Sequence, residues 1–326
     1  MTDARRLPVE AWGRRLLTDA QAWADRSRWR GYAFEFLWFG LKQGWACLFG
    51  GAMLALIVAT FLWWPEGAPV SRYDFLVVGA AAIQAAMLAF RLESWEEARV
   101  ILLFHLAGTV MELFKTHHGS WVYPEDSILR IGAVPLFSGF MYAAVGSYIA
   151  RVQRIFHIRV TRYPPLWTTW LLAAAIYVNF FAHHWLPDVR LLLFGATALL
   201  FGRGWFHFTA DRRRRSMPLL PGYFLVALFI WIAENLATFG RAWAYPGQAD
   251  GWEMVGFEKL GSWFLLMIVS VVLVSLVHRP DEEGAGVGEW RGEGNGAGVG
   301  MSLAERSGLS PLPPLPRPST LNPRPR

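Results

Sequence analysis

Eight apolar segments, each close to the length that crosses a lipid bilayer, dominate the middle of this 326-residue chain. A transmembrane helix needs about 20 consecutive, mainly apolar residues. Windows of that size give segments 44–64, 73–90, 100–116, 132–150, 166–186, 190–208, 218–238 and 259–277. Only 17% of the residues are charged, against roughly a quarter in soluble domains. The sequence therefore predicts an all-α fold, a polytopic membrane helix bundle of about eight transmembrane helices.

Basic residues mark one side of the predicted bundle. Arginines gather before the first segment, between residues 151 and 162, and in the run Arg212 to Arg215. Cytoplasmic connections carry such an excess, whereas the alternate connections are nearly free of it. We therefore expect a multi-pass protein of the bacterial plasma (inner) membrane with both termini in the cytoplasm. The net charge of +6 is then explained by orientation in the lipid bilayer, and no nucleic acid partner is expected.

The composition divides the chain into three parts. Residues 1–35 form a basic cytoplasmic amino-terminal segment, in which helical spacing of Trp12, Leu16, Ala20 and Trp23 fits either an interfacial helix or a solvated one. Residues 36–280 form the transmembrane domain. Residues 281–326 are rich in Gly and Pro, a composition that cannot form a core, and are predicted to be a disordered cytoplasmic tail.

An internal repeat relates the two halves of the transmembrane domain. A shift of the chain by 122 residues superimposes five pairs around a shared Trp-x-Tyr-Pro turn. The pairs are Glu112 and Glu234, Thr116 and Thr238, Trp121 and Trp243, Tyr123 and Tyr245, and Pro124 and Pro246. The predicted halves, 44–150 and 166–277, each contain four spans. Because four is even, both repeats would have the same orientation, as in parallel transporter repeats.

The repeated glutamates are the strongest candidates for a functional role. A carboxylate in the hydrocarbon region costs about 2.5 to 3.5 kcal/mol on insertion scales, so it normally faces the bundle interior and finds a partner. Burial also favours the neutral form, which can donate a proton. We predict Glu112 and Glu234 as acid/base groups. Polar and aromatic neighbours predicted to bind substrate are His105, Thr116, Trp121, Tyr123, Asn179, His183, Asn235, Thr238, Trp243 and Tyr245.

Other interpretations of these residues stay open. The Trp and Tyr side chains also fit an interfacial aromatic belt, and each Glu could brace the turn beside it. The pairs His117-His118 and His183-His184 are adjacent residues, which point to different helix faces, so no metal is expected. The single Cys47 excludes an internal disulfide, and nucleotide-binding and serine-hydrolase motifs are missing, so no cofactor is expected. Glu93, Glu96 and Glu97 are predicted to be solvated charges at a helix end.

Three sequence runs resemble a known family. The runs LFHLAGTVMELFKTHHGSWVYPE, PLFSGFMYAAVGSYIAR and IAENLATFGRAWAYPGQADGWEM are similar to the bacterial membrane proteins grouped as domain of unknown function 817. The resemblance covers roughly residues 30–280 and implies a multispan architecture without a known activity.

A shorter stretch resembles carotenoid-modifying membrane enzymes. Glu112, Gly119, Trp121 and Tyr123, followed by Gly-Ala-Val-Pro-Leu at 132–136 and by Tyr142, are similar to the pattern in hydratases that add water to a terminal polyene double bond. That resemblance implies an acid role for Glu112. Where the related lycopene cyclases have paired acids, Phe137 and Ser138 stand here. The hypotheses are an intramembrane enzyme acting on a lipidic, isoprenoid or carotenoid-like substrate, a proton-coupled transporter or exporter of a small molecule, and a structural membrane protein.

Overall fold

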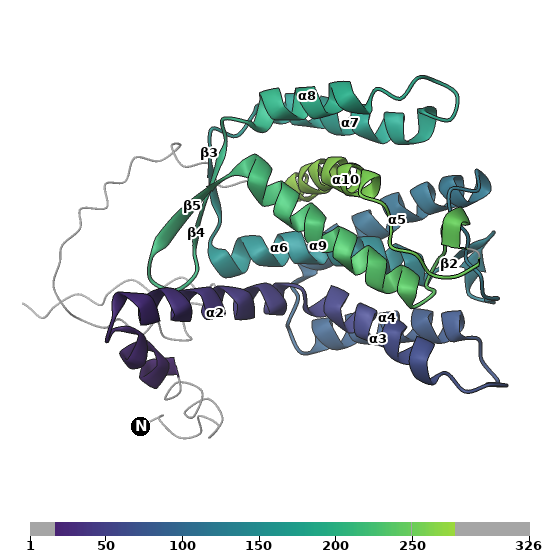
Figure 1. Ribbon diagram of the computed structural model, residues 1–326, viewed down its shortest axis with the longest axis horizontal. Coiled ribbons are helices and arrows are strands. Elements are labelled where there is room, and N and C mark those ends of the chain that lie inside the picture. The colour runs from purple at the N-terminus through teal and green to yellow at the C-terminus, as the bar shows by residue number, and fades with distance from the viewer. Residues whose placement is uncertain (1–16, 249, 278–326) are drawn as a thin grey trace, which may run out of the picture. The chain divides into compact units, whose positions relative to one another are not determined.

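The computed structural model describes residues 17–248 and 250–277, which are mostly helical (Figure 1). The helices are α2 (Arg28–Ala46), α3 (Leu48–Trp63), α4 (Arg72–Ala89), α5 (Trp95–His117), α6 (Phe137–Phe156), α7 (Leu166–Ala182), α8 (Arg190–Phe201), α9 (Leu219–Phe239), α10 (Glu258–Ser275) and the short η1 (Pro246–Gln248). The strands are β1 (Arg130–Ile131), β2 (Val134–Pro135), β3 (Arg159–Thr161), β4 (Trp205–Thr209) and β5 (Arg214–Pro218). The predicted tail 281–326 and positions Trp12 and Leu16 of the amino-terminal segment lie outside the described residues.

Each of the eight predicted apolar segments overlaps one helix, from α3 to α10, and several boundaries differ by four to seven residues. The first segment was expected to begin at residue 44, whereas α2 continues to Ala46 and bends by 71° into α3. The sixth was expected to reach residue 208, whereas α8 ends at Phe201. Gly202 and Gly204 follow, and the alternating Trp-Phe-His-Phe-Thr of β4 favours a strand.

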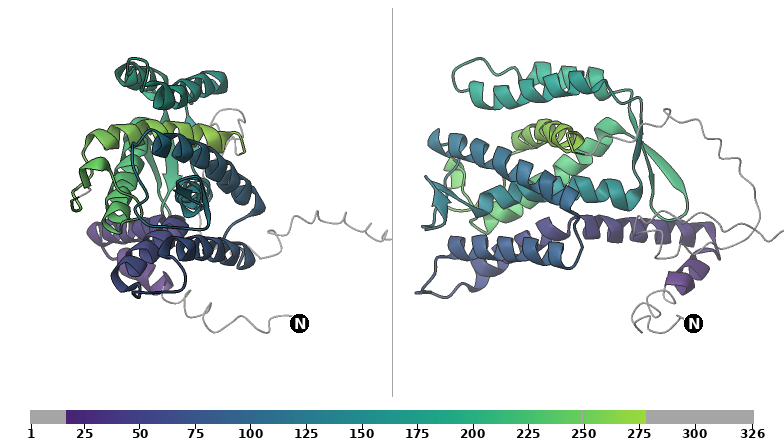
Figure 2. Two further views of the ribbon diagram at one scale, coloured as in Figure 1. Left: turned by 90° about the vertical axis from the view of Figure 1, so that its right-hand side faces the viewer. Right: turned by 180° about the vertical axis from the view of Figure 1, so that it is seen from behind.

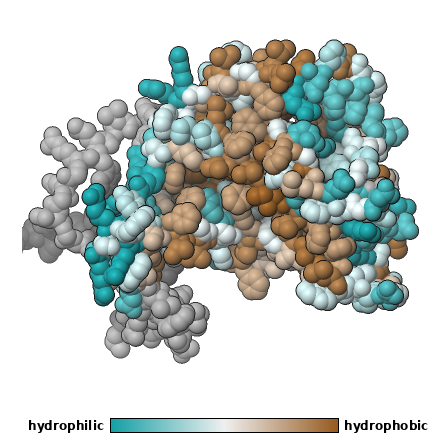
Figure 3. All heavy atoms as spheres, in the orientation of Figure 1, coloured by the Kyte–Doolittle hydropathy of each residue, from teal (hydrophilic) through white to brown (hydrophobic). Residues whose placement is uncertain are grey.

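Three helices, α4, α9 and α10, are long and apolar enough to cross a membrane, and the bent pair α2 and α3 would provide a fourth. The shorter α7 and α8 are also apolar. The 12 residues of α8 rise only about 18 Å, less than the roughly 30 Å of a hydrocarbon core. Figure 3 shows apolar side chains across the middle of one face, with polar side chains gathered towards its two ends.

The connections of the bundle form two separate polar ends. At one end, β3, β4 and β5 make an antiparallel sheet, to which α2 is joined by an ion pair between Glu35 and Arg215 (Figures 1 and 2). Lys42 Nζ of α2 also donates to the Thr209 carbonyl, at 3.4 Å. At the other end, the start of α4 and the loops that follow α5 and α9 are hydrogen-bonded to one another. The basic connections therefore share one end, as the charge pattern predicts.

Close contact between α5 and α6 fixes the geometry of the bundle interior. A Cβ placed on Gly108 of α5 would lie 2.5 Å from the ring of Tyr142 on α6, and one on Gly146 would lie 2.7 Å from Phe104. Small residues of this kind let two helices approach closely where the surrounding lipid supplies no hydrophobic driving force. The absent side chain at Gly108 leaves the space that the Tyr142 ring occupies.

The prediction of solvated charges at the start of α5 is wrong for two of its residues. Glu93 and Glu97 are 5% and 2% exposed. Ser147 of α6 donates to Glu93, while Glu97 completes a capping box with Ser94 and is 3.1 Å from Arg154. Burial is compensated because each carboxylate has partners from a neighbouring helix.

Candidate functional site

Glu112 lies on α5 and is bound by three side-chain donors. Its carboxylate is 4% exposed. Trp121 Nε1 and Tyr123 OH donate to Oε2, at 2.8 and 2.7 Å, and Tyr142 OH donates to Oε1 at 2.7 Å. Trp121 and Tyr123 come from the turn that follows α5, whereas Tyr142 comes from α6. The buried acid is thus fully satisfied without an adjacent cation.

Glu234 on α9 is bound in a related way but with one different partner. It is also 4% exposed. Tyr245 OH, from the turn after α9, donates to Oε1 at 2.5 Å, and Trp263 Nε1 of α10 donates to Oε2 at 2.7 Å. Tyr245 therefore takes the role that Tyr123 has beside Glu112. The indole donor comes from α10 and not from Trp243, which packs beside the buried cluster around Tyr73 and Phe137.

The two Trp-x-Tyr-Pro turns contact each other. Val122 and Ala244, which are also 122 residues apart, form an isolated antiparallel bridge with both N···O distances at 2.9 Å. The ring of Trp121 packs edge-on against that of Tyr245, with centroids 6.1 Å apart. A reciprocal pairing of equivalent residues is the contact that a two-fold axis produces. The two glutamate sites are therefore neighbours joined through their turns.

A narrow apolar cavity adjoins both sites. Its volume is about 40 Å³, and it lies among α5, α6, α7, α9 and α10. Its walls include Gly108, Met111, Tyr142, Tyr177, Ile230 and Trp263. Tyr142 and Trp263 are also donors to Glu112 and Glu234. Neither carboxylate lines the cavity. Tyr142 lies between the cavity and Glu112, and Trp263 lies between the cavity and Glu234.

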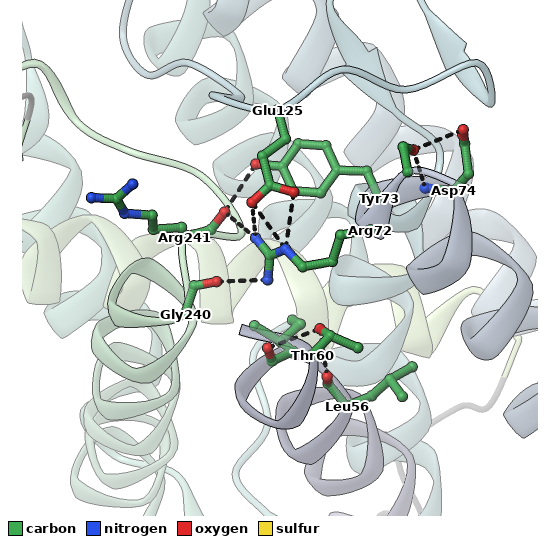
Figure 4. Close-up of polar contacts among 10 residues, drawn as sticks. Leu56, Thr60, Arg72, Tyr73, Asp74, Glu125, Gly240 and Arg241 are labelled. Atoms are coloured by element: carbon green, nitrogen blue, oxygen red, sulfur yellow. Dashed lines mark hydrogen bonds and ion pairs between the residues drawn. The ribbon is translucent and has the colours of Figure 1, made fainter. Parts of the chain in front are cut away.

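An ion pair between a buried arginine and a partly exposed glutamate holds the loops of this end in place (Figure 4). Arg72, at the start of α4, is 4% exposed and pairs with Glu125 at 2.6 Å. Its Nη1 and Nη2 donate to the carbonyls of Gly240 and Arg241, each at 2.9 Å. The Asp74 carboxylate accepts hydrogen bonds from the Ser127 hydroxyl and from the main-chain amides of residues 128 and 129. This network connects the loops on either side of the two glutamate sites.

The phenols in the turns are shielded from ionisation. Burial, followed by the charge of Glu112 and its hydrogen bond, raises the pKa of Tyr123 well above its usual value. Burial and Glu234 do the same to the pKa of Tyr245. Both hydroxyls therefore stay protonated near neutral pH and can donate to the carboxylates.

A second group of polar side chains surrounds Lys115, three residues after Glu112 on α5. Lys115 is 3% exposed, and its Nζ lies 3.2 Å from His184 Nε2 and 3.5 Å from His183 Nε2. The His118 ring stacks on that of His184, with centroids 4.9 Å apart. Burial and the charge of Lys115 lower the pKa of His184, which favours its neutral form. Within the described part of the chain, no group of three or more metal-binding side chains is placed to hold an ion.

Comparison with known proteins identifies the family. The family model described as "Protein of unknown function (DUF817)" matches residues 35–271. The chain belongs to the DUF817 family. The "Uncharacterized protein YoaT" of Bacillus subtilis (strain 168) is 41% identical over 249 residues, which cover 76% of this chain and 94% of that protein. No solved structure matches the chain. These matches confirm the family resemblance, and they do not show the resemblance to carotenoid-modifying enzymes.

In this DUF817 protein, the predicted polar residues fall into separate groups. Trp121, Tyr123 and Tyr245 contact the glutamates. Thr116 and Thr238 instead donate to main-chain carbonyls one turn back, and Thr238 also accepts from Trp252. The side-chain oxygen of Asn235 accepts a hydrogen bond from the Val255 amide.

Three further predicted residues lie away from the carboxylates. His105 packs against Phe140, with ring centroids 4.9 Å apart. Asn179 binds Asp188 and the Val189 amide, closing the connection between α7 and α8. His183 belongs to the Lys115 group.

Two important partners of the glutamates were missing from the predicted set. Tyr142 and Trp263 are 30 and 29 residues from the glutamates they contact. The repeat offset does not reveal them, since it places Phe264, and not Trp263, opposite Tyr142. The one usable signal for Tyr142 was its place in the stretch that resembles carotenoid-modifying enzymes.

Proposed function

We propose that this DUF817 protein is an intramembrane enzyme that acts on a lipidic, isoprenoid-like substrate, with Glu112 as its acid/base group. The observation that carries the proposal is the placement of Tyr142, which both lines the apolar cavity and donates to Glu112. The lining is apolar, and Tyr142 at its edge connects it to a buried carboxyl. Because about 40 Å³ is well below the roughly 300 to 1,000 Å³ of ordinary ligand pockets, an apolar chain enters only when the surrounding helices move apart. Clefts with mainly apolar walls and a few convergent polar groups are typical of ligand sites.

The hydrogen bonds determine where a proton would sit on Glu112. An indole N–H can only donate, so Oε2, which accepts from Trp121 and Tyr123, is the oxygen that stays unprotonated. A neutral Glu112 then carries its proton on Oε1, and the Tyr142 hydroxyl accepts it. The same hydroxyl can pass its own proton towards the cavity. Glu112 and Tyr142 thus form a two-step relay.

Glu234 is arranged differently. Trp263 donates to its Oε2, so a proton on Glu234 would sit on Oε1, beside Tyr245. Tyr245 is absent from the residues that line the cavity in the described part of the chain. We infer that Glu234 holds Trp263 and the turn in position, while Glu112 performs the proton transfer.

The chemistry that suits this arrangement is proton addition to a carbon–carbon double bond. The relay delivers a proton to one carbon, and the cation on the other is stabilised by the faces of Tyr142 and Trp263. Water then adds to the cation and returns a proton to Glu112, so the net reaction is hydration. Low water content in the cavity protects the cation until that step.

The membrane arrangement is part of the same proposal. We infer that α3 to α10 cross the bacterial plasma membrane as two parallel four-helix repeats, with both termini in the cytoplasm. Supporting observations are the helix in every predicted segment, the arginine-rich end with β3 to β5, and the reciprocal bridge of Val122 and Ala244. The glutamate sites then lie near the outer leaflet.

A second candidate function is proton-coupled transport of a small molecule. The observation that favours it is the presence of two buried carboxyls at equivalent positions of the repeat, as in transporters built from two halves. Proton-dependent flux in vesicles that Glu234→Gln abolishes would support this function over the enzymatic one.

The test of the enzymatic proposal is a lipid comparison by mass spectrometry. Cells that make acyclic isoprenoids or carotenoids would express the full chain, the Glu112→Gln variant or the matched Glu66→Gln variant. Glu66 is an exposed glutamate of the same end and leaves the relay intact. We expect wild type and Glu66→Gln to yield products heavier by one water, and Glu112→Gln to yield none. An unchanged lipid profile in all three strains would contradict the proposal.

A further inference from the structure

The inner face of α5 continues from the apolar cavity to a buried cation. Gly108 and Met111 line the cavity, and Lys115 follows Met111 by four residues, so the three share one helix face. On α7, Tyr177 of the cavity wall precedes His183 by six residues, which is about 9 Å along a helix. The two helices therefore connect the cavity to the Lys115 group at the outer end.

Lys115 has hydrogen-bond acceptors but no counter-ion in the part of the chain that the structure describes. Nδ1 of His183 faces the Asn179 carbonyl at 3.1 Å, so it carries the hydrogen and leaves Nε2 to accept from Lys115. His184 Nε2 accepts in the same way, and the ring of Phe180 lies 4.5 Å from Nζ. These partners are neutral. Among the described residues, no carboxylate forms an ion pair with Lys115, which is 3% exposed.

Two of the three charged side chains that act on Lys115 are also positive. Lys259 and Arg190 lie near enough to repel Lys115. Asp188 attracts it, but that carboxylate is occupied by Arg190, at 3.2 Å, and by the Asn179 side chain. A buried cation without a counter-ion is costly unless something supplies the negative charge. His184 is exposed, so an anion from outside can reach the group.

We propose that Lys115, His183 and His184 bind a phosphate-type anion, the head group of a ligand whose apolar chain enters the adjoining cavity. The Lys115 ammonium donates directly, and each imidazole donates through Nε2 once it takes up a proton from solvent, which the charge of the bound anion favours. The anion site stands on the contacts of Lys115 alone, whereas the position of the chain rests on the proposed function. Together they define the substrate class as an anionic amphiphile, such as an isoprenoid phosphate.

Binding measurements on the purified full chain in neutral detergent test this proposal. Tryptophan fluorescence would report titrations with geranyl phosphate, geraniol and inorganic phosphate, because Trp185 packs against His118, with ring centroids 5.1 Å apart. We expect geranyl phosphate to bind at least tenfold more tightly than either of the others. Equal affinities for geranyl phosphate and geraniol would overturn the anion site and leave the lipidic cavity standing. Equal affinities for geranyl phosphate and inorganic phosphate would support the anion site but contradict the lipidic substrate of the proposed function.

Variants locate the anion. Lys115→Gln should weaken geranyl phosphate binding at least tenfold and leave geraniol binding unchanged, while Lys115→Arg should keep most of the affinity. Lys42→Gln is the matched control, since Lys42 is a partly buried lysine bonded to a carbonyl at the opposite end. If Lys115→Gln does not fold, His184→Gln at its exposed position should show a smaller loss of the same selectivity. Unchanged geranyl phosphate affinity in the folded variants would refute the assignment.

Discussion

At the scale of single residues, the arrangement around Glu112 explains how an acid is kept inside an apolar bundle. Three donors converge on the carboxylate, and two of them come from the turn that follows its own helix. Tyr123 and Tyr245 each lie eleven residues after the glutamate they contact. A buried polar group with all its partners is stable, whereas loss of the acceptor leaves several donors without one.

Substitutions of Glu112 should separate its structural role from its chemical role. In Glu112→Gln, the amide oxygen still accepts from Trp121 and Tyr123, and the amide NH2 faces the Tyr142 hydroxyl, which can accept. We expect its thermal stability to change by less than about 1 kcal/mol, whereas Glu112→Ala, with three orphaned donors, should lose about 3 kcal/mol or more. Thermal unfolding in detergent measures both. Equal losses for the two variants would contradict the hydrogen-bond network.

Alkaline pH provides a second test at this scale. The pKa values of Tyr123 and Tyr245 are raised in the folded chain, because burial and the neighbouring glutamates disfavour the phenolates. The unfolded chain ionises its tyrosines near their usual pKa of about 10. The contribution of these two residues to stability is therefore fully present below that pH and is lost as the pH rises above it.

Ultraviolet titration of phenolate absorbance checks this expectation. Tyr123→Phe should remove one tyrosine from the fraction that titrates only on unfolding. The matched control is Phe substitution of Tyr32, which is exposed. If Tyr123→Phe removed an ordinary titrating group, the buried position of that phenol would be incorrect.

At the scale of helices, the contact between α5 and α6 determines whether Tyr142 reaches Glu112. The ring occupies the space left by Gly108, so its hydroxyl lies 2.7 Å from Oε1. Trp263 depends in the same way on the packing of α10 against α9. The hydrogen bonds from Tyr142 and Trp263 to the glutamates are thus set by helix packing and not by the adjacent turns.

Gly108→Ala tests the close contact directly. The added Cβ would lie 2.5 to 2.7 Å from three carbons of Tyr142, so the ring must move. Overpacking of this kind typically costs about 1 to 3 kcal/mol. We expect a lower melting temperature and reduced activity, whereas Gly51→Ala on α3, where an added Cβ meets nothing within 4 Å, should change neither. Identical behaviour of the two variants would contradict the contact.

The sequence predicted what depends on local pattern. Apolar length gave the places of helices α3 to α10 along the chain, and the repeated Trp-x-Tyr-Pro turn gave Tyr123 and Tyr245 as neighbours of the glutamates. It did not give Trp263, because that contact depends on how α10 packs against α9. It also misplaced Glu93 and Glu97, since their burial follows from partners on α6 that sequence position does not reveal. The end of α8 was missed because glycines and a strand-forming run interrupt a segment that is mainly apolar.

At the scale of the whole described chain, the arginine-rich connections lie together at the end of the bundle that holds β3 to β5. Chemical labelling tests the proposed orientation in the membrane. In a Cys47→Ser background, cysteine would be introduced at exposed Asp126, in the loop after α5, and at exposed Arg213, between β4 and β5. We expect an impermeant maleimide to label the Asp126→Cys variant in intact cells, and the Arg213→Cys variant only after permeabilisation. The reverse result would invert the orientation.

Glu112 is proposed to act through Tyr142 on a ligand in the cavity, and a comparison of two tyrosines separates this role from a structural one. Tyr142 and Tyr245 both donate to a buried glutamate, but only Tyr142 lines the cavity. Lipid extracts from cells that express Tyr142→Phe or Tyr245→Phe would be compared with wild type by mass spectrometry, at matched levels of folded protein. We expect Tyr142→Phe to abolish the lipid product and Tyr245→Phe to retain most of it. Full conversion by Tyr142→Phe would contradict the proposed role of Tyr142.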